Sequence, residues 1–219
     1  MSTVHHVSES ARQQLVATAA RLSQLGLSPG SSGNVSVREG DAIVMSPTGS
    51  DLAALDVDNL SVLDFDGTLL DGPKASKEYP LHRAMYRRRS EHRAVVHLHS
   101  SHASAVSCAS PWSPHSAVPP LTPYFVMRVG QTPLIRYADP GDVAQAELVE
   151  ALAFPFRAAL LQNHGLITAG PTMQSALDSA VELEETCKLL LLLGSRPSRQ
   201  LTAEEAARVA AKSSSPWSV

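Results

Sequence analysis

The chain has 219 residues, a formal net charge of −3 and 43% hydrophobic residues, with 18% of its residues charged. These values are typical of a globular domain, and they argue against an intrinsically disordered chain and against a basic nucleic-acid-binding surface. No linker or internal repeat divides the sequence. We therefore expect a single domain over residues 1–219, with a mobile tail from about residue 213.

Cysteine usage and hydropathy limit the cellular location that we expect. Cys108 and Cys187 stand in unrelated contexts and predict no disulfide framework, which favours the reducing cytoplasm. The leucine-rich run at 189–193 is too short to cross a bilayer and predicts a buried helix. No N-terminal stretch resembles a signal peptide, so we expect a cytoplasmic protein without a membrane partner.

The first part of the chain predicts a helix followed by a hairpin. Apolar residues at helical spacing predict a helix over 8–25. Residues 35–37 and 42–45 predict the two strands of a β-hairpin. Glycine-bearing polar loops at 31–34 and 46–50 flank it, and such loops expose backbone N–H groups and hydroxyls that can bind an anion. We expect the two loops to form a phosphate site together.

A second hairpin is predicted over 60–70, with Asp66 and Gly67 at its turn. The string from Asp64 to Thr68, DFDGT, also matches the DxDGT signature of haloacid-dehalogenase-type phosphatases, whose first aspartate attacks phosphorus. No convincing acidic pair follows downstream. The hairpin is therefore the favoured interpretation, and the phosphatase is kept as an alternative.

A polar segment leads into the next predicted helix, over 81–89. Glu78, near the helix start, either compensates the helix dipole or acts as an acid and base beside a metal. Ser76 and Lys77 add a hydroxyl and a positive charge that suit a phosphate. His82 lies four residues after Glu78 on the same helical face, where it either orients the carboxylate or is a packed core residue.

The stretch AVVHLHSSHA at 94–103 predicts a buried strand that ends at two histidines. His97 and His99 point to the same face of a strand, and burying two imidazoles without partners is costly. A shared cation therefore competes with ordinary core packing as their explanation. A second apolar strand over 159–168, interrupted by Asn163-His164-Gly165, offers a third imidazole, and three neutral imidazoles suit a catalytic zinc.

The remaining segments complete a mixed α/β pattern. A loop rich in proline and serine covers residues 111–124. Two further strands are predicted over 125–129 and 133–137. Three helices are predicted over 142–153, 172–193 and 202–211.

Five motifs in this order, SSGNVSVR, SPTG, SKE, HLHSSH and NHG, resemble the class II aldolase/adducin family over about residues 10–195. The stretches KASKEYPLHRAMY and PPLTPYFVMRVGQTPLIRYADPGD most resemble its 3-oxo-tetronate 4-phosphate decarboxylase branch. The resemblance implies a three-layer α/β/α fold with a largely antiparallel central sheet, and a homotetramer with sites at subunit interfaces. It also implies a divalent metal, usually zinc, held by His97, His99 and His164.

The same resemblance assigns roles to other residues. Glu78 falls where the aldolases carry their catalytic glutamate, and Tyr124 lies in the loop where they can carry a catalytic tyrosine. Lys77 replaces the second serine of the aldolases' SSE segment and offers an extra cation for a substrate carboxylate or phosphate. His102 falls in a helix and outside the family's ligand spacing, so we expect a structural role for it. The phosphate- and substrate-binding positions are Gly33, Asn34, Thr48, Gly49, Ser76 and Lys77.

The implied reaction is the metal-dependent decarboxylation of a 3-oxo-tetronate 4-phosphate to dihydroxyacetone phosphate and carbon dioxide, through an enediolate that the metal stabilises. The alternatives are an L-fuculose-phosphate aldolase, an L-ribulose-5-phosphate 4-epimerase, a methylthioribulose-1-phosphate dehydratase and a non-enzymatic adducin-like module. The three retained histidines argue against the last of these. The expected partner is a phosphorylated small sugar acid or sugar.

Overall fold

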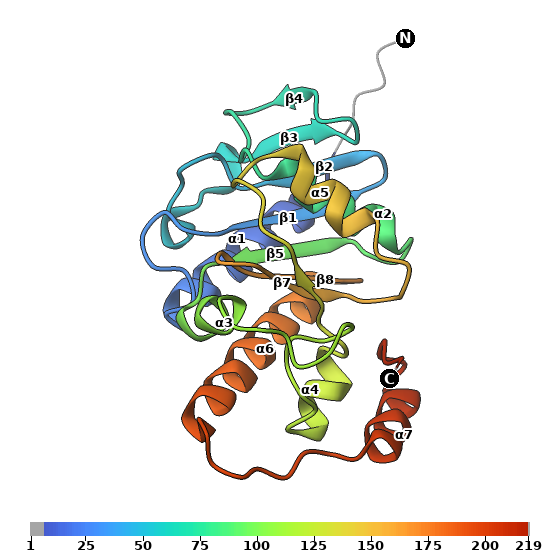
Figure 1. Ribbon diagram of the computed structural model, residues 1–219. Helices are drawn as coiled ribbons and strands as arrows, with labels where there is room; N and C mark the ends of the chain where they lie inside the picture. The colour runs from blue at the N-terminus through green and yellow to red at the C-terminus, as the bar shows by residue number, and fades with distance from the viewer. Residues whose placement is uncertain (1–6, 219) are drawn as a thin grey trace.

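An eight-stranded sheet in the order β4-β3-β2-β1-β5-β8-β7-β6 forms the centre of the fold (Figure 1). The computed structural model describes residues 7–218. Within them, neighbouring strands are antiparallel except for β6 and β7, which are parallel. The strands are β1 (Asn34–Glu39), β2 (Ala42–Met45), β3 (Ser61–Asp64), β4 (Leu69–Asp71), β5 (Ala94–Leu98), β6 (Leu134–Ile135), β7 (Ala158–Leu161) and β8 (Gly165–Gly170).

Helices cover both faces of this sheet, which confirms the predicted three-layer α/β/α fold. One layer contains α1, α3, α4, α6 and α7, and the other contains α2 and α5. The helices are α1 (Glu9–Gln24), α2 (Tyr79–Arg88), α3 (Ser101–Ser107), α4 (Pro123–Arg128), α5 (Val143–Glu150), α6 (Met173–Leu193) and α7 (Ala203–Ser213). Two short 3₁₀ helices, η1 (Leu52–Ala54) and η2 (Val57–Asn59), connect β2 to β3.

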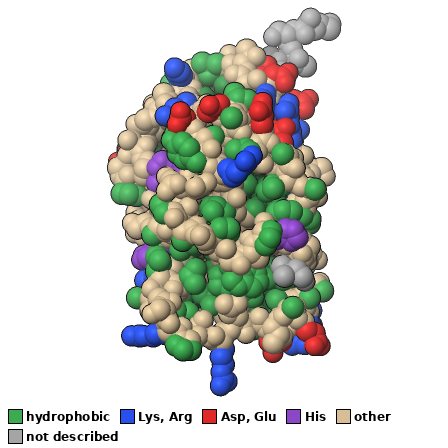
Figure 2. All heavy atoms as spheres, viewed as in Figure 1, with side chains coloured by type: hydrophobic (Ala, Val, Ile, Leu, Met, Phe, Trp, Pro, Cys, Tyr) green, Lys and Arg blue, Asp and Glu red, His purple; other side chains and the backbone are tan. Residues whose placement is uncertain are grey.

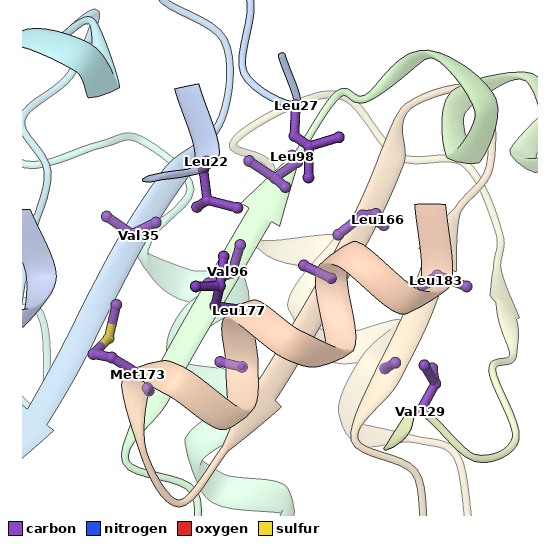
Figure 3. Close-up of a cluster of buried hydrophobic side chains, with 14 of the residues drawn as sticks. Leu22, Leu27, Val35, Val96, Leu98, Val129, Leu166, Met173, Leu177 and Leu183 are labelled. Carbon is purple, nitrogen blue, oxygen red and sulfur yellow. The ribbon is translucent and has the colours of Figure 1, made fainter. Parts of the chain in front are cut away.

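Alternating side chains on the central strand divide the core into two halves. Val96 and Leu98 of β5 belong to the half of the core that contains α6, and Figure 3 shows Val96 beside Leu177 of that helix and Leu98 beside Leu27. Val95 belongs instead to the core that β5 shares with α2 and α5. Since side chains two residues apart share a face of a strand, His97 points to the α2 side of the sheet.

The strand predicted over 125–129 is wrong, because this segment forms helix α4. Thr122 is the N-cap, and its side chain accepts a hydrogen bond from the backbone N–H of Phe125. Pro123 occupies the first turn, where the fixed φ of proline suits a helix and its missing N–H costs nothing. These start signals outweigh the strand preference of the run FVMRV.

The strand predicted over 159–168 is two strands, β7 and β8, joined by a tight turn that contains His164. The remaining expected helices and hairpins are present, and their ends lie within three residues of the predicted ones. The strand predicted over 133–137 is reduced to Leu134–Ile135. The second hairpin turns through Phe65–Thr68 rather than two residues alone, because Gly67 N–H donates to Asp64 O.

The leucine-rich end of α6 is helical but not buried, so that part of the prediction is wrong. Leu192 is 66% exposed, and Leu189 and Leu191 are also exposed. The physical reason is that α6 continues beyond the edge of the sheet that it covers (Figure 1), and Figure 2 shows hydrophobic side chains gathered over the lower part of this face. Among residues 7–218, no helix combines the length and apolar composition that crossing a bilayer requires.

The C-terminal segment, expected to be mobile from about residue 213, follows α7 back onto α4. Pro216 O accepts a hydrogen bond from Gln131 N at 2.9 Å. The Trp217 ring packs edge-on against Phe125, with 6.4 Å between ring centroids. These contacts give the segment defined partners on the helical layer.

The arginine run 87–89 lies at the C-terminal end of α2, and its middle residue, Arg88, connects α2 to α5. Arg88 donates hydrogen bonds at 2.6–2.8 Å to three backbone carbonyls, those of Val149, Leu152 and Phe154. Its guanidinium also lies 4.0 Å from the centroid of the Phe156 ring. Arg88 therefore satisfies the carbonyls at the end of α5 and fixes α5 against α2.

We predict that Arg88→Leu lowers the free energy of unfolding by about 3 kcal/mol, because hydrogen bonds to a charged group are lost and the carbonyls remain partly buried. Chemical denaturation measures this change. The control is Arg87→Leu, whose exposed ion pair with Glu150 contributes no more than about 1 kcal/mol. Equal destabilisation by the two variants would contradict the role of Arg88.

Candidate active site

Three imidazoles converge on one point at the end of the central strands. His97 lies on β5, His99 follows that strand, and His164 lies in the β7–β8 turn. The Nε2 atom of His99 is 3.0 Å from Nε2 of His97 and 2.9 Å from Nε2 of His164. The structure thus brings together the three predicted metal ligands, although 65 residues separate His99 from His164.

The local sequence Asn163-His164-Gly165 explains how His164 is held in so tight a turn. Asn163 has a φ of 56°, a left-handed conformation that asparagine adopts more readily than most residues. A Cβ at Gly165 would collide with Leu98 O, so only glycine lets β8 begin beside β5 here. Ser107 O and Oγ accept from the backbone N–H groups of Asn163 and His164, which attaches the turn to α3.

The nitrogen atoms at the centre are arranged as a cation site. Nδ1 of His97 donates to Leu166 O at 2.8 Å, which directs the opposite ring nitrogen, Nε2, at the other two imidazoles. A backbone carbonyl behind a histidine is the usual arrangement around a bound metal. In a tetrahedral zinc site with bonds of about 2.0 Å, ligand atoms lie about 3.3 Å apart. The observed spacing therefore fits a divalent cation.

Glu78 completes the cluster as a fourth donor. Its Oε2 is 3.3 Å from Nε2 of His97 and its Oε1 is 3.3 Å from Nε2 of His164. All four residues offer ligand atoms within 4.8 Å of one another. Oε2 also accepts a hydrogen bond from Asn34 at 2.7 Å, whereas Oε1, although buried, has no hydrogen-bond partner among residues 7–218.

Burial and neighbouring charges set the protonation of this cluster. Burial raises the pKa of Glu78, but the attraction of His97, the Asn34 hydrogen bond and the attraction of His164 outweigh it and lower the pKa to about 2. Burial, followed by repulsion from His97, lowers the pKa of His99 and of His164 to about 4. At neutral pH the carboxylate is ionised and these two imidazoles are neutral, the forms that bind a metal.

A cavity of about 380 Å³ opens beside the cluster. All six residues predicted to bind phosphate or substrate line this cavity, together with Glu78 and His99. An antiparallel bridge between Pro47 and Ala75 holds the 46–50 loop against the 74–77 segment. The lining residues are Ser31, Ser32, Gly33, Asn34, Pro47, Thr48, Gly49, Ser76, Lys77, Glu78, His99 and Pro140.

Two features shape the edge of this cavity. Gly33 has a φ of +81°, and a Cβ there would lie 2.8 Å from His97 O, so the first loop passes directly over the end of β5 that carries His97. Gly141 lies against the stem of Lys77, because a Cβ at Gly141 would be 3.0 Å from the Cδ and Cγ atoms of Lys77. The positive charge of Lys77 also contributes to the lowered pKa of His99 and His164. Lys77 therefore makes the cavity favourable for anions.

Three other sequence-derived candidates lie outside the cluster. Tyr124 is 57% exposed on α4 and is not part of the cavity lining. His102 donates a hydrogen bond from Nδ1 to Glu184 Oε1 at 2.7 Å, in line with the structural role expected for it. Asp64 accepts hydrogen bonds from the backbone N–H groups of Asp66 and Thr68, so the DFDGT string stabilises its own turn.

Sequence reasoning missed Glu184 of α6, which is buried and supports the start of α3. It accepts hydrogen bonds from Ser100 Oγ and from the backbone N–H groups of His102 and Ala103. The carboxylate thus caps a helix that begins two residues after His99. A lone glutamate on an amphipathic helix carries no sequence signal for such a contact.

His82 is fully buried, and its ring makes its hydrogen bonds to Asn34 and Ser36 rather than to the Glu78 carboxylate. Its Nε2 is 2.5 Å from Asn34 Oδ1 and its Nδ1 is 2.7 Å from Ser36 Oγ. Burial is the largest cause that lowers the pKa of His82, to about 3. This ring is therefore neutral in the folded protein at every pH above that value.

The geometry can be compared with known proteins. The family model described as "Class II Aldolase and Adducin N-terminal domain" matches residues 13–191. The chain belongs to the class II aldolase and adducin family. Among class II aldolase and adducin relatives, the 3-oxo-tetronate 4-phosphate decarboxylase of Escherichia coli (strain K12) is 42% identical over 210 residues, which cover 95% of this chain and 99% of the relative.

Two further relatives extend this comparison. The L-fuculose phosphate aldolase of Escherichia coli (strain K12) is 33% identical over 181 residues, which cover 82% of this chain and 81% of the aldolase. The crystal structure of YgbL from Escherichia coli is 41% identical and superposes with a TM-score of 0.87, over 92% of this chain and 98% of that one. The class II aldolase fold is therefore present over nearly the whole chain.

The depressed pKa of His82 predicts a specific pH dependence of stability. Below pH 6.5 the unfolded chain binds a proton at His82 and the native chain does not, so the free energy of unfolding falls as pH decreases, by up to about 1.4 kcal/mol per pH unit. Denaturant melts of the wild type and of His82→Gln between pH 7 and pH 5 measure this. The wild type should lose more stability than the variant over that interval. Parallel curves would contradict the assignment.

Proposed function

We propose that this protein is a metal-dependent carbon–carbon lyase that decarboxylates a 3-oxo-tetronate 4-phosphate to dihydroxyacetone phosphate and carbon dioxide. The observation that carries the proposal is the cluster of three imidazoles and one carboxylate at the wall of a cavity that Lys77 also lines. Relatives named 3-oxo-tetronate 4-phosphate decarboxylase match at 40–45% identity, whereas an L-fuculose phosphate aldolase matches at 33%. This difference favours decarboxylation over aldol cleavage.

The metal we propose is zinc, held by His97, His99 and His164. The donor set supports this choice, because three neutral imidazoles with a fourth position for water, carboxylate or substrate are typical of catalytic zinc. When bound, such a cation acts as a Lewis acid that stabilises negative charge on substrate oxygens. The buried Oε1 of Glu78 gives this carboxylate an atom free for chemistry.

The substrate would bind with its phosphate in the two loops that flank the first hairpin. Gly33 and Asn34 come from one loop, and Thr48 and Gly49 from the other. Thr48 N–H already donates to Lys74 O at 3.0 Å, so the hydroxyl is the donor that Thr48 can offer. Ser76 and Lys77 supply a further hydroxyl and a cation at the same cavity wall, and we assign Lys77 to an anionic end of the substrate.

Glu78 would move the proton in this reaction. Breaking the bond between C1 and C2 releases carbon dioxide and leaves the electron pair on C2, conjugated with the C3 carbonyl. A proton must then reach C2 to give dihydroxyacetone phosphate. Glu78 is ionised in the resting protein, so it would take up one proton from solvent water and pass it to C2 through Oε1; the hydroxide left by that water combines with the released carbon dioxide as bicarbonate.

We also propose a cytoplasmic homotetramer. The exposed leucines at the end of α6 support association of copies, because contiguous exposed apolar side chains favour protein contacts. Both cysteines are free thiols, which suits a reducing compartment. Tyr124 is exposed on α4, so a catalytic role for it requires that it reach the site of a neighbouring copy.

The decisive experiment assays carbon dioxide and aldehyde release from four-carbon sugar-acid phosphates, with metal content measured on the same sample. We expect carbon dioxide, dihydroxyacetone phosphate and about one zinc per chain. His164→Ala should lose both the metal and at least about 100-fold in turnover. Asp64→Asn is the control and should retain activity, whereas its inactivation alongside an active His97→Ala would support the phosphatase instead.

A second variant tests the assignment of Lys77. Lys77→Ser introduces the serine that the aldolases carry and should raise KM by about 10- to 100-fold, because the loss of one charged contact to an anion costs about 1.5–3 kcal/mol. Lys74→Ser, an exposed lysine in the same segment, is the matched control and should leave KM unchanged. Steady-state kinetics on the decarboxylation substrate provide the comparison, and an unaltered KM in Lys77→Ser would remove this residue from the substrate site.

A further inference from the structure

A line of five buried polar side chains leads from Glu78 into the interior between α2 and β1. Glu78, His82 and Tyr86 recur every four residues along α2, and Asn34 and Ser36 recur every two residues along β1. Four residues of helix rise about 6.0 Å and two residues of strand about 6.6 Å. The two spacings nearly match, so side chains from the helix and the strand alternate along one line.

Four hydrogen bonds connect this line. Asn34 Nδ2 donates to Glu78 Oε2 at 2.7 Å, and His82 Nε2 meets Asn34 Oδ1 at 2.5 Å. Ser36 Oγ lies 2.7 Å from His82 Nδ1 and 2.6 Å from Tyr86 OH. The five side chains are at most 5% exposed, so bulk water cannot replace these bonds.

The Glu78 carboxylate at the end of this line fixes the donor and the acceptor of each hydrogen bond. An ionised carboxylate only accepts, so the amide nitrogen of Asn34 must face Glu78 and the amide oxygen must face His82. That oxygen also only accepts, so His82 carries its proton on Nε2. The neutral ring then presents a lone pair at Nδ1, to which the Ser36 hydroxyl donates, and Tyr86 donates to Ser36.

We propose that His82 is a positioning residue for Glu78, acting through Asn34. The chain of bonds holds Oε2 and fixes the rotation of the carboxylate, so that Oε1 is the oxygen left to exchange protons with the substrate. The inference rests on the proposed function, since it assumes that Glu78 transfers the proton. Catalytic groups lose up to about 100-fold in rate when displaced by about 1 Å.

Two substitutions at one position separate positioning from simple packing. His82→Gln can place an amide nitrogen where Nε2 lies and still donate to Asn34. His82→Asn reaches only as far as Nδ1 and loses that donor. We expect kcat to fall by about 10- to 100-fold in His82→Asn, with KM and bound metal within twofold of wild type, and to recover to within about fivefold in His82→Gln.

The matched control is His92→Asn. His92 is equally buried and bonds through Nδ1 to Met85 O, outside the line described above. It should lose stability and keep its kcat. A kcat in His82→Asn equal to that of wild type, or equal losses of kcat in the Gln and Asn variants, would overturn the proposal.

A double-mutant cycle tests the route through Asn34. If His82 acts through that amide, adding His82→Asn to Asn34→Ala should lower kcat no further. If the two residues act independently, the double variant should show the product of the two single losses of kcat. Glu78→Gln distinguishes the two levels of inference. A fully active Glu78→Gln would refute the proton-transfer role itself, while an inactive Glu78→Gln beside a fully active His82→Asn would refute only the positioning by His82.

Discussion

The antiparallel pairing of β5 between β1 and β8 is the constraint on which the site depends. Across one side, Asn34 is the register partner of His97, and across the other, His97 is the partner of Ile167, three residues after His164. A shift of either pairing by one residue would reverse the faces of all side chains on the shifted strand. The register therefore determines whether the imidazoles meet at all.

The interior between α2 and β1 departs from the apolar pattern of the rest of the core. Buried polar groups are stable only when each is hydrogen-bonded, and the line from Tyr86 to Asn34 satisfies every member. This line occupies the half of the core on the α2 side, next to Val95, Ile43 and Met45. On the opposite face, where α6 covers the sheet, the strand side chains are mainly apolar, and Thr168 of β8 donates its hydroxyl to Ala176 O of α6. The connected line of buried polar side chains thus lies on the same face of the sheet as His97.

Features that depend on residues close together in the sequence could be predicted from it. The alternation of apolar residues predicted the hairpins, and the His97 and His99 pair follows from strand geometry alone. The run from Phe125 was misassigned because its β-branched and aromatic residues imitate a strand, although Thr122-Pro123 is a helix start. The contacts of Glu184 and Ser36 could not be predicted, since they depend on how separate elements meet in space.

The three imidazoles are carried by a central strand and a three-residue turn, whereas the cavity wall is built from the loops at 31–34 and 46–50 and the segment around Pro140. β5 is paired with a strand on each side, and the turn is attached to α3 through Ser107, whereas the 46–50 loop is held by the single bridge between Pro47 and Ala75. Sequence changes can therefore accumulate in the cavity loops while the histidine cluster stays in place. Such a division lets one scaffold acquire new substrates by loop exchange, and it makes those loops, rather than the histidines, the places to redesign selectivity.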